Sequence, residues 1–476
     1  MAAQGLMTGA ELQARRQDTP EQKKSAEPQT PAEDTGPSRA RDQEPADQSP
    51  SNRLRNLLDH HGLISGAALP SQRAEQHAHI EAGSFDIDTL VPGEVIGDHD
   101  QSFYLVRRDF PLDHRQGTVP LSAALEAVPK HIALSACDAG LEAFDPEKTL
   151  FIDTETTGLS GGTGTVAFLV GAGYFTEGVF RLEQCFMRDY DDEEPMLRYL
   201  DGIFRRCDAV VSYNGKSFDM PLLRTRFTAN RLTFGLDGAL HFDLVHAARR
   251  FWKLRLRDCS LGNIERVILG LQRFGDVPSA EIPQIWFDYL NSGNATRLEH
   301  VFYHHSMDIL SLVSLTALLS QCLDAPDGHG FEHDEDRLSL VRLYFRQKRF
   351  DDVVRHARDL LDAETAGPIR HDCLEMLALA HKRLHHWNEM EETWDLLVRE
   401  SPEAILPRLE LAKHHEHRTR NLPAAERICR ETLELLETRA ALDRDPSLPH
   451  TQAFRRRLER VQRKLAKVRG HERDWE

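Results

Sequence analysis

The sequence lacks the features that would place it in a membrane or in an oxidising compartment. No uninterrupted apolar run reaches the ~20 residues that a helix needs to cross a bilayer, and the N-terminus has no apolar signal-peptide core. The seven cysteines are scattered, odd in number and without a Cys-x-x-Cys pair, which argues against a disulfide framework or a zinc site. We therefore expect a cytoplasmic protein with reduced thiols and no membrane partner.

Basic residues are also fewer than acidic residues. The 476 residues include 59 Lys and Arg against 76 Asp and Glu, which gives a formal net charge of −17. This balance argues against non-specific wrapping of nucleic acid. It is compatible with a nuclease, because metal-binding carboxylates are negative until the metal binds. The length predicts two or three domains rather than one core.

Composition and periodicity divide the chain into four segments. Residues 1–50 are rich in polar residues and proline and poor in aromatic and β-branched residues, so we expect a disordered tail. Residues 51–145 contain short β-like runs, such as 87–91 and 102–106, and predict a small mixed or β-rich region. Residues 146–323 alternate strand and helix patterns, and residues 334–470 are helical throughout. The predicted fold class is therefore α/β followed by an all-α domain.

The patterns of residues 146–323 predict a mixed five-stranded sheet with flanking helices. Short links favour antiparallel pairing of the first three strands. Three antiparallel strands followed by βα units is the order of a ribonuclease-H-like fold. The predicted strands are 149–153, 166–175, 179–187, 209–213 and 241–244, and the predicted helices are 193–207, 217–230 (with Ser217 as N-cap), 245–254, 261–269, 282–290 and 297–322.

The helical tail repeats an apolar pattern. Phe350, Trp387 and Leu422 begin similar patterns at offsets of 37 and 35 residues, near the 34 residues of tetratricopeptide repeats. Stacked repeats present a concave surface, so we expect a protein or peptide partner there. A plain helical bundle with accidental spacing is the alternative.

The residues suited to chemistry begin at the end of the first predicted strand. Asp153 and Glu155 are two residues apart, so their carboxylates point to the same side. Two such carboxylates after a buried run are costly unless a cation lies between them. Oxygen ligands of this kind suit Mg²⁺ or Mn²⁺. A polar strand end that leads into a Gly-rich loop is the simpler alternative.

Two later features extend this pattern. Asp219 falls in the first turn of a predicted helix, whose dipole favours a carboxylate, although it could merely cap that helix. His304 and Asp308 share one face of a late helix, although a histidine there could belong to the core. Four carboxylates of this kind can hold two cations about 3.5–4 Å apart, which stabilise the attacking and leaving oxygens of a phosphodiester displacement. A neutral histidine nearby can orient or deprotonate the attacking water.

Three strings together resemble the DEDD exonuclease superfamily of ribonuclease-H-like enzymes. They are Asp153-Thr-Glu155-Thr-Thr-Gly158, Asn214-x3-Phe218-Asp219 and His304-x3-Asp308. With the Gly-rich loop 158–164 and Phe168-Leu-Val-Gly171, the segment is most similar to the bacterial YprB-type ribonuclease-H-like family. The resemblance implies a 3′–5′ exonuclease that uses two Mg²⁺ or Mn²⁺ ions. The metal ligands would be Asp153, Glu155, Asp219 and Asp308, and these four with His304 would be the catalytic residues.

The third string differs from the Tyr-x3-Asp and His-x4-Asp forms that are usual in the superfamily. His304 occupies the tyrosine position of the first form, and Tyr303 occupies the histidine position of the second. His304, Tyr303 and His305 therefore all stay candidates for handling the water, and we take His304 as the leading one.

Basic residues indicate where a substrate could bind. Arg249, Lys253 and Arg257 are spaced at four, so they would line one helix face with Phe251 and Trp252 interleaved. Basic and aromatic side chains together suit a track for single-stranded nucleic acid. A face that merely offsets the acidic excess is the alternative. Nucleic-acid contacts are also expected from three residues of the second string, Asn214, Lys216 and Phe218.

The leading hypothesis is a metal-dependent nuclease, most simply a 3′–5′ exonuclease, that acts on single-stranded DNA or RNA. The alternative is a non-catalytic ribonuclease-H-like domain that binds nucleic acid and serves as an adaptor through its helical repeats. The unusual third string and the acidic composition favour the alternative, whereas the presence of all four carboxylates favours the enzyme.

Overall fold

The computed structural model describes residues 86–98, 101–158, 164–324, 331–363, 365–442 and 448–473. The predicted disordered tail 1–50 and the helical pattern at 52–61 lie outside these residues, as does most of the Gly-rich loop 158–164.

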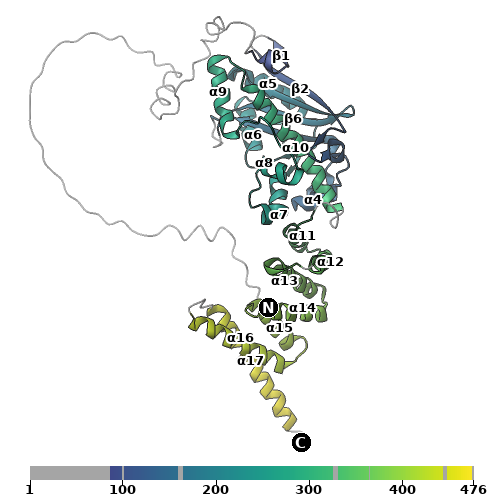
Figure 1. The fold of residues 1–476 in the computed structure, drawn as a ribbon, viewed down its shortest axis with the longest axis vertical. Coiled ribbons are helices and arrows are strands. Elements are labelled where there is room, and N and C mark those ends of the chain that lie inside the picture. The colour runs from purple at the N-terminus through teal and green to yellow at the C-terminus, as the bar shows by residue number, and fades with distance from the viewer. Residues whose placement is uncertain are drawn as a thin grey trace, which may run out of the picture. The chain divides into compact units, whose positions relative to one another are not determined.

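A mixed sheet forms the centre of the α/β part (Figure 1). Within the described residues it has seven strands, in the order β1-β2-β7-β6-β5-β8-β9. Strands β5, β6 and β7 pair antiparallel, and β8 and β9 continue the sheet in parallel. This is the predicted ribonuclease-H-like order. The bounds are β1 Glu94–Asp98, β2 Gln101–Pro111, β5 Thr149–Thr156, β6 Ala167–Thr176, β7 Val179–Phe186, β8 Ala209–Ser212 and β9 Leu240–Asp243, and a separate pair is formed by β3 Arg115–Gln116 and β4 Val119–Pro120.

The prediction of five strands was too low. Strand β2 pairs with β7 over its last eight residues, and β1 pairs with β2, so the sheet gains two strands at that edge. Complementary charges fix this register: Arg107 lies opposite Glu183 with Nε 2.7 Å from Oε1, and Asp109 lies opposite Arg181. The β-like expectation for 87–91 was wrong, because these residues begin the short helix α3 Ile87–Leu90.

Helices cover both faces of the sheet. Phe151 of β5 packs into one core with residues of α7 and α10. Its neighbours Leu150 and Ile152 pack into the other core with residues of α5, α6 and α9, as the alternation of a strand requires. The helices are α4 Pro129–Ala136, α5 Glu193–Phe204, α6 Asp219–Ala229, α7 Leu244–Leu256, α8 Leu261–Ile264, α9 Ile282–Ser292 and α10 Leu298–Asp324. A π-helix spans Glu265–Leu269, and 3₁₀ turns span Leu121–Ala124, Ala139–Ala143, Pro146–Lys148, Tyr190–Asp192 and Ser279–Glu281.

Helix α10 is long and apolar enough to cross a membrane by length and composition alone. However, 78% of its apolar window is buried inside the protein. Gly171 of β6 allows this close packing, because a Cβ there would lie 2.0 Å from Ile309 Cδ1 and 2.6 Å from His305 Cε1. Helix α10 is thus a core helix whose buried polar residues pack against β5.

The described residues after 331 are helical, as predicted. Phe350, Trp387 and Leu422 are each the first residue of a helix, and the residue two positions earlier has a positive φ in all three cases. The same turn therefore recurs at the offsets found in the sequence. The assignment to tetratricopeptide repeats stays a prediction. The helices are α11 Asp334–Arg346, α12 Phe350–Asp362, α13 Gly367–Leu384, α14 Trp387–Glu400, α15 Ile405–His417, α16 Leu422–Ala441 and α17 Leu448–Arg473.

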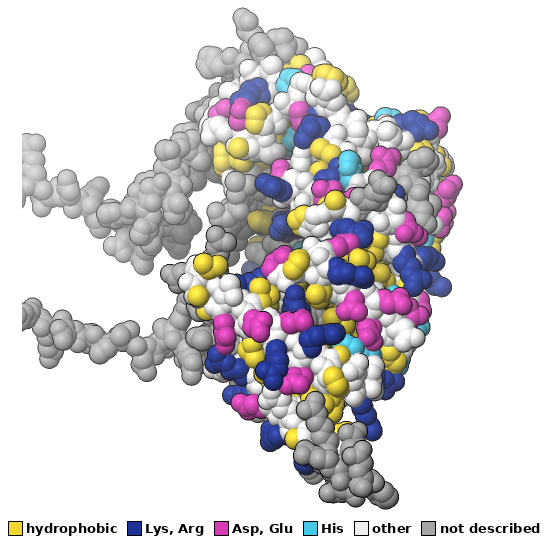
Figure 2. All heavy atoms as spheres, turned by 60° about the horizontal axis from the view of Figure 1, so that its bottom comes forward, with side chains coloured by type: hydrophobic (Ala, Val, Ile, Leu, Met, Phe, Trp, Pro, Cys, Tyr) yellow, Lys and Arg dark blue, Asp and Glu magenta, His cyan; other side chains and the backbone are white. Residues whose placement is uncertain are grey.

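The charged side chains of this region are mixed in sign. Figure 2 shows Lys and Arg intermingled with Asp and Glu over the face it draws. Some basic residues of α17 are engaged within the protein, because the fully buried Glu416 carboxylate pairs with Arg457, Arg460 and Lys464 at 2.5–2.8 Å. The basic sequence of α17 therefore contributes in part to packing against α15.

Candidate active site

The predicted carboxylates converge where β5 meets α6 and α10. Asp153 and Glu155 lie near the end of β5, with side chains that are 19% and 14% exposed. Asp219 is the first residue of α6 and is buried. The Thr154 hydroxyl donates a hydrogen bond to its carboxylate and ties α6 to β5. Asp308 of α10 completes the group, which we call the acidic cluster: Asp153, Glu155, Asp219 and Asp308.

Two members of the acidic cluster and the adjacent His304 have the spacing of a metal site. Ligand atoms of Glu155, His304 and Asp308 all lie within 4.8 Å of one another. His304 Nε2 is 3.9 Å from Glu155 Oε1 and 3.5 Å from Asp308 Oδ2. Carboxylate and imidazole ligands at this spacing suit a divalent cation.

The acidic cluster is electrostatically strained. Burial raises the pKa of Asp153 and Glu155 well above its usual range, and repulsion from Asp308 and Asp219 raises it further. Burial also raises the pKa of Asp219 to about 6, against a hydrogen bond from Thr154 that lowers it. Gathering four carboxylates here costs free energy that a bound cation would recover.

His304 presents one ring nitrogen to the acidic cluster and is held by the other. Its Nδ1 lies 2.8 Å from Asp276 Oδ1. Because a carboxylate only accepts, we assign the proton to Nδ1, which leaves Nε2 facing Glu155 and Asp308 as a proton acceptor. A carboxylate that orients a histidine in this way also stabilises the imidazolium that forms when the ring takes a proton.

His305 also has both nitrogens engaged, as His304 does with Asp276 and, at 3.4 Å, the Ser279 hydroxyl, but His305 is fully buried. Its Nδ1 accepts a hydrogen bond from Gln184 Nε2 at 3.1 Å, and its Nε2 donates to the Asp153 backbone carbonyl at 3.1 Å. Burial lowers the pKa of His305 to about 4, so the ring is neutral at pH 7. This residue therefore fixes the backbone of β5 at Asp153, and neither of its ring nitrogens is free to bind another group.

The loop between β8 and α6 is fixed by Asp243, which sequence reasoning missed. Its Oδ1 accepts from the Asn214 N–H at 2.7 Å, and its Oδ2 accepts from the Lys216 N–H at 3.0 Å. Gly215 is required beside it, because a Cβ there would lie 2.4 Å from Ser212 Oγ and 3.0 Å from Asp219 Oδ2. The expectation of Ser217 as N-cap was wrong, since α6 begins at Asp219 with Phe218 at its N-cap position.

Arg273, Glu265 and Asp276 were also missed. The Arg273 side chain is 11% exposed, binds Glu265 through two nitrogens at 2.5 and 2.7 Å, and pairs with Asp308. Glu265 begins a π-helix, a feature that often marks functional sites. Nothing in the aperiodic loop sequence signals these contacts, which join residues 8 to 35 positions apart. Arg273 gives the acidic cluster one fixed cation.

The predicted basic track holds only in part. Arg249 and Lys253 are exposed on α7. Arg257 lies beyond the last turn of α7 with φ 61°, so the expectation that it shares their face was wrong. Phe251 and Trp252 are 0% and 1% exposed, so they are core residues and not stacking surfaces. Of the second-string residues, Lys216 and Phe218 are exposed beside Asp219, and Asn214 has its N–H bound to Asp243.

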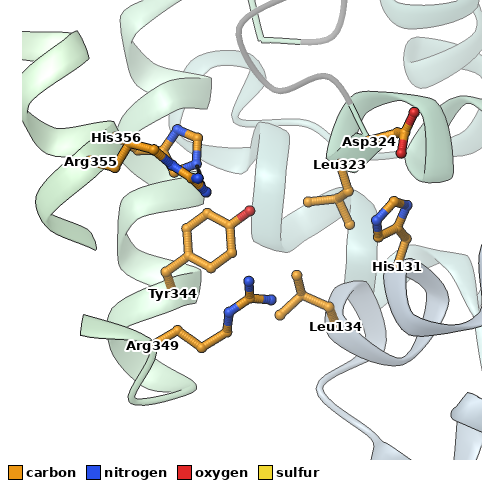
Figure 3. A pocket seen from close by; sticks show the side chains of 8 residues that line it. All are labelled: His131, Leu134, Leu323, Asp324, Tyr344, Arg349, Arg355 and His356. Atoms are coloured by element: carbon orange, nitrogen blue, oxygen red, sulfur yellow. Dashed lines mark hydrogen bonds between the residues drawn. The ribbon is translucent and has the colours of Figure 1, made fainter. Parts of the chain in front are cut away.

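A separate cavity of about 290 Å³ lies away from the acidic cluster (Figure 3). The Tyr344 ring forms one wall, with the Arg349 guanidinium 4.9 Å from its centroid and the His356 ring stacked at 5.2 Å. The lining residues come from α4, the end of α10, α11, the turn that leads into α12, and α12 itself: His131, Leu134, Leu323, Asp324, Tyr344, Arg349, Arg355 and His356. This cavity shares no residue with the acidic cluster, so it is not part of the candidate active site.

Comparison with known proteins agrees with the fold. Residues 150–320 match the family model described as the RNase_H superfamily. The chain is also similar to the uncharacterized protein YprB of Bacillus subtilis (strain 168), with 29% identity over 343 residues. The aligned region covers 70% of this chain and 81% of YprB. The matched residues contain the whole acidic cluster.

Proposed function

We propose that this chain, whose residues 150–320 form a domain of the RNase_H superfamily, is a divalent-metal-dependent nuclease that removes nucleotides from the 3′ end of single-stranded nucleic acid. The observation that carries the proposal is the acidic cluster beside an oriented histidine. Asp153, Glu155 and Asp219 have raised pKa values. Burial raises all three pKa values, and repulsion within the cluster raises those of Asp153 and Glu155 further, so the charged form is costly until a cation is bound.

The donor set fits Mg²⁺ or Mn²⁺. The four carboxylates are hard oxygen ligands, and Arg273 compensates for only one of their charges. When bound, two such ions would stabilise the attacking and leaving oxygens of the phosphodiester displacement. The ligands would be the four carboxylates of Asp153, Glu155, Asp219 and Asp308. His304 Nε2 lies close enough to Glu155 and Asp308 to contact a cation that they bind.

His304 is proposed to accept the proton of the attacking water. Its Nε2 faces the acidic cluster, and its Nδ1 is bound to Asp276. As Nε2 takes the proton, the Asp276 carboxylate stabilises the resulting positive charge on the ring. General-base assistance of this kind is worth about 10²- to 10⁴-fold in rate. Tyr303 stays the alternative residue for this step.

The substrate assignment rests on the exposed residues beside Asp219 and on the resemblance to exonucleases. Lys216 offers a charge for a phosphate, and Phe218 is 53% exposed. Arg249 and Lys253 are exposed on α7, the next helix along the chain, and are proposed to contact the backbone of a longer strand. The 3′–5′ direction and the cytoplasmic location belong to the proposal, as does a protein or peptide partner for the helices after residue 334.

A second candidate is the non-catalytic adaptor. Arg273 is the observation that favours it, because its guanidinium occupies one oxygen of Asp308 and binds Glu265 tightly. If this ion pair persisted in the presence of metal, Asp308 would be unavailable as a full ligand. The domain would then bind nucleic acid without cutting it.

The test is a nuclease assay on 5′- and 3′-labelled single-stranded DNA and RNA, with Mg²⁺, Mn²⁺ or EDTA. The proposal expects metal-dependent release of a 3′ label as mononucleotide and progressive shortening of the 5′-labelled strand. An Asp219→Asn variant purified in parallel controls for contaminating nucleases. Binding of the strands without cleavage in any metal would favour the adaptor, and internal cutting would replace the exonuclease by an endonuclease.

A further inference from the structure

Two phenylalanines are exposed in the part of the chain that the structure describes, and each adjoins the acidic cluster in a different way. Phe218, 53% exposed, immediately precedes Asp219. Phe274, 75% exposed, immediately follows Arg273, whose guanidinium binds Asp308. The other described phenylalanines are buried or partly buried. Exposure of apolar rings at these two places therefore coincides with the candidate active site.

Phe274 stands at the tip of a turn that is fastened on both sides. Arg273 before it is bound to Asp308 and Glu265, and Asp276 after it is bound to His304. Gly275 between them has φ 68°, a conformation that favours glycine. Because consecutive Cα atoms lie about 3.8 Å apart, these anchors hold Phe274 beside the residues of α10 that belong to the site.

Phe218 is held in a comparable way, in the loop between β8 and α6. The N–H groups of Asn214 and Lys216 donate to Asp243 and so fix the loop that carries Phe218. The residue after Phe218, Asp219, begins α6. Lys216 is exposed two residues before Phe218. Each of these two described loops thus presents one aromatic ring to solvent from a fixed backbone.

We infer that Phe274 is a base-stacking platform, and that with Phe218 it holds unstacked bases of a single strand at the acidic cluster. This inference rests on the proposed nuclease function. Aromatic rings bind bases of any sequence through their faces, while a site for paired strands would need no ring at this position. The preference for a single strand then comes from the rings, since a base within a duplex is already stacked on its neighbours. Arg273 is a positioning residue for Phe274, because it fastens the turn to α10.

The experiment measures binding of fluorescent 12-nucleotide oligothymidylate and oligouridylate to the full chain with Ca²⁺ present, and then of the same strands with abasic 3′-terminal positions. Base–aromatic stacking predicts that Phe274→Ala weakens binding of the base-containing strand about 5- to 150-fold. The abasic strand should bind the variant and the wild type alike. Phe274→Trp should restore affinity, and its added fluorescence should fall when the base-containing strand binds.

Val95→Ala is the matched control, because Val95 is an apolar residue 49% exposed on β1; its affinity should equal that of the wild type. Equal affinity of wild type and Phe274→Ala for the base-containing strand would overturn the inference, and so would an equal loss on the abasic strand. A wild-type protein that neither binds nor cleaves either strand would instead overturn the proposed function, and the inference with it.

Discussion

Replacing Asp219 by asparagine is expected to stabilise the metal-free protein while it abolishes nuclease activity. The carboxyl group is almost completely buried, and its pKa rises from 3.8 to about 6. The unfolded chain therefore ionises this group more readily than the folded chain does. At neutral pH the folded state carries a buried charge that the asparagine variant lacks, whereas the side-chain volume is unchanged.

The magnitude follows from the pKa difference. At 1.36 kcal/mol per pKa unit, a rise from 3.8 to about 6 costs the folded state about 3 kcal/mol at pH 7. The asparagine oxygen can still accept from Thr154. The variant loses the favourable interaction of a carboxylate with the N-terminus of α6, about 0.3–1 kcal/mol, and its amide N–H needs a partner. A net stabilisation of about 1–2 kcal/mol remains, equivalent to a melting temperature about 2–8 °C higher.

The assay is thermal unfolding of wild type and Asp219→Asn from pH 3.5 to 7.5 in EDTA, repeated with Mn²⁺. The pKa of Asp219 is higher in the folded chain than in the unfolded chain. The free-energy cost of its charge in the folded state is therefore absent below pH 3.8, grows as pH rises towards 6 and becomes constant above that. The advantage of the variant should therefore appear over this range, and Mn²⁺ should stabilise only the wild type. A variant that melts lower than the wild type at pH 7 in EDTA would refute the reasoning, as would an advantage that is independent of pH.

Four further outcomes are expected. His304→Ala should slow cleavage about 10²- to 10⁴-fold with little change in metal-free stability; a wild-type rate would assign the water to Tyr303 or to no side chain. Gly171→Val should destabilise the fold by more than 2 kcal/mol in denaturant unfolding, because its side chain would overlap α10; wild-type stability would contradict the packing described. The carboxyl of Glu416 has its pKa lowered to about 2 by Arg460 and Lys464. This group stabilises the fold above pH 4.5, and the contribution is lost as pH falls through 2, so Glu416→Gln should cost about 3 kcal/mol at pH 7. Unchanged hydrogen exchange in α17 of that variant would contradict this. Replacing Arg249 and Lys253 by Ala should lower the slope of log affinity against log salt by about 0.7 each. An unchanged slope would show that neither side chain contacts a phosphate.

The strands and the acidic cluster could be predicted because their signals are local. Short apolar runs mark β5 to β8, and the two-residue spacing of Asp153 and Glu155 survives in any strand. The spacing of His304 and Asp308 is likewise a property of one helix. Each of these signals depends on residues within one element, which is why the fold and the cluster could be inferred together.

The residues that support the cluster could not be predicted, because their roles depend on contacts between distant segments. Arg273 lies in a loop without periodicity and meets Asp308 only after α10 packs onto the sheet. Asp243 looks like an ordinary N-cap of α7, which it also is, and its second role needs the neighbouring loop in place. Arg257 was misplaced because nothing in the sequence marks the positive φ that ends α7.

The β-like run 102–106 was expected and lies in β2, but its place in the central sheet was missed for a similar reason. Strand β2 joins the sheet through β7, whose paired residues lie 68 to 82 positions later, and the pairing of Arg107 with Glu183 becomes visible only when the register is known. Sequence reasoning therefore treated these residues as a separate β-rich region.

The most direct test of the central claim is the rate at which mononucleotides leave a 3′-labelled single strand, measured for wild type and Asp153→Asn at the same Mn²⁺ concentration. The structure places Asp153 at the end of β5 with its carboxyl buried among the other three. We predict release by the wild type that EDTA abolishes, and no release above the metal-free background by the variant. Release by Asp153→Asn at the wild-type rate would contradict the account.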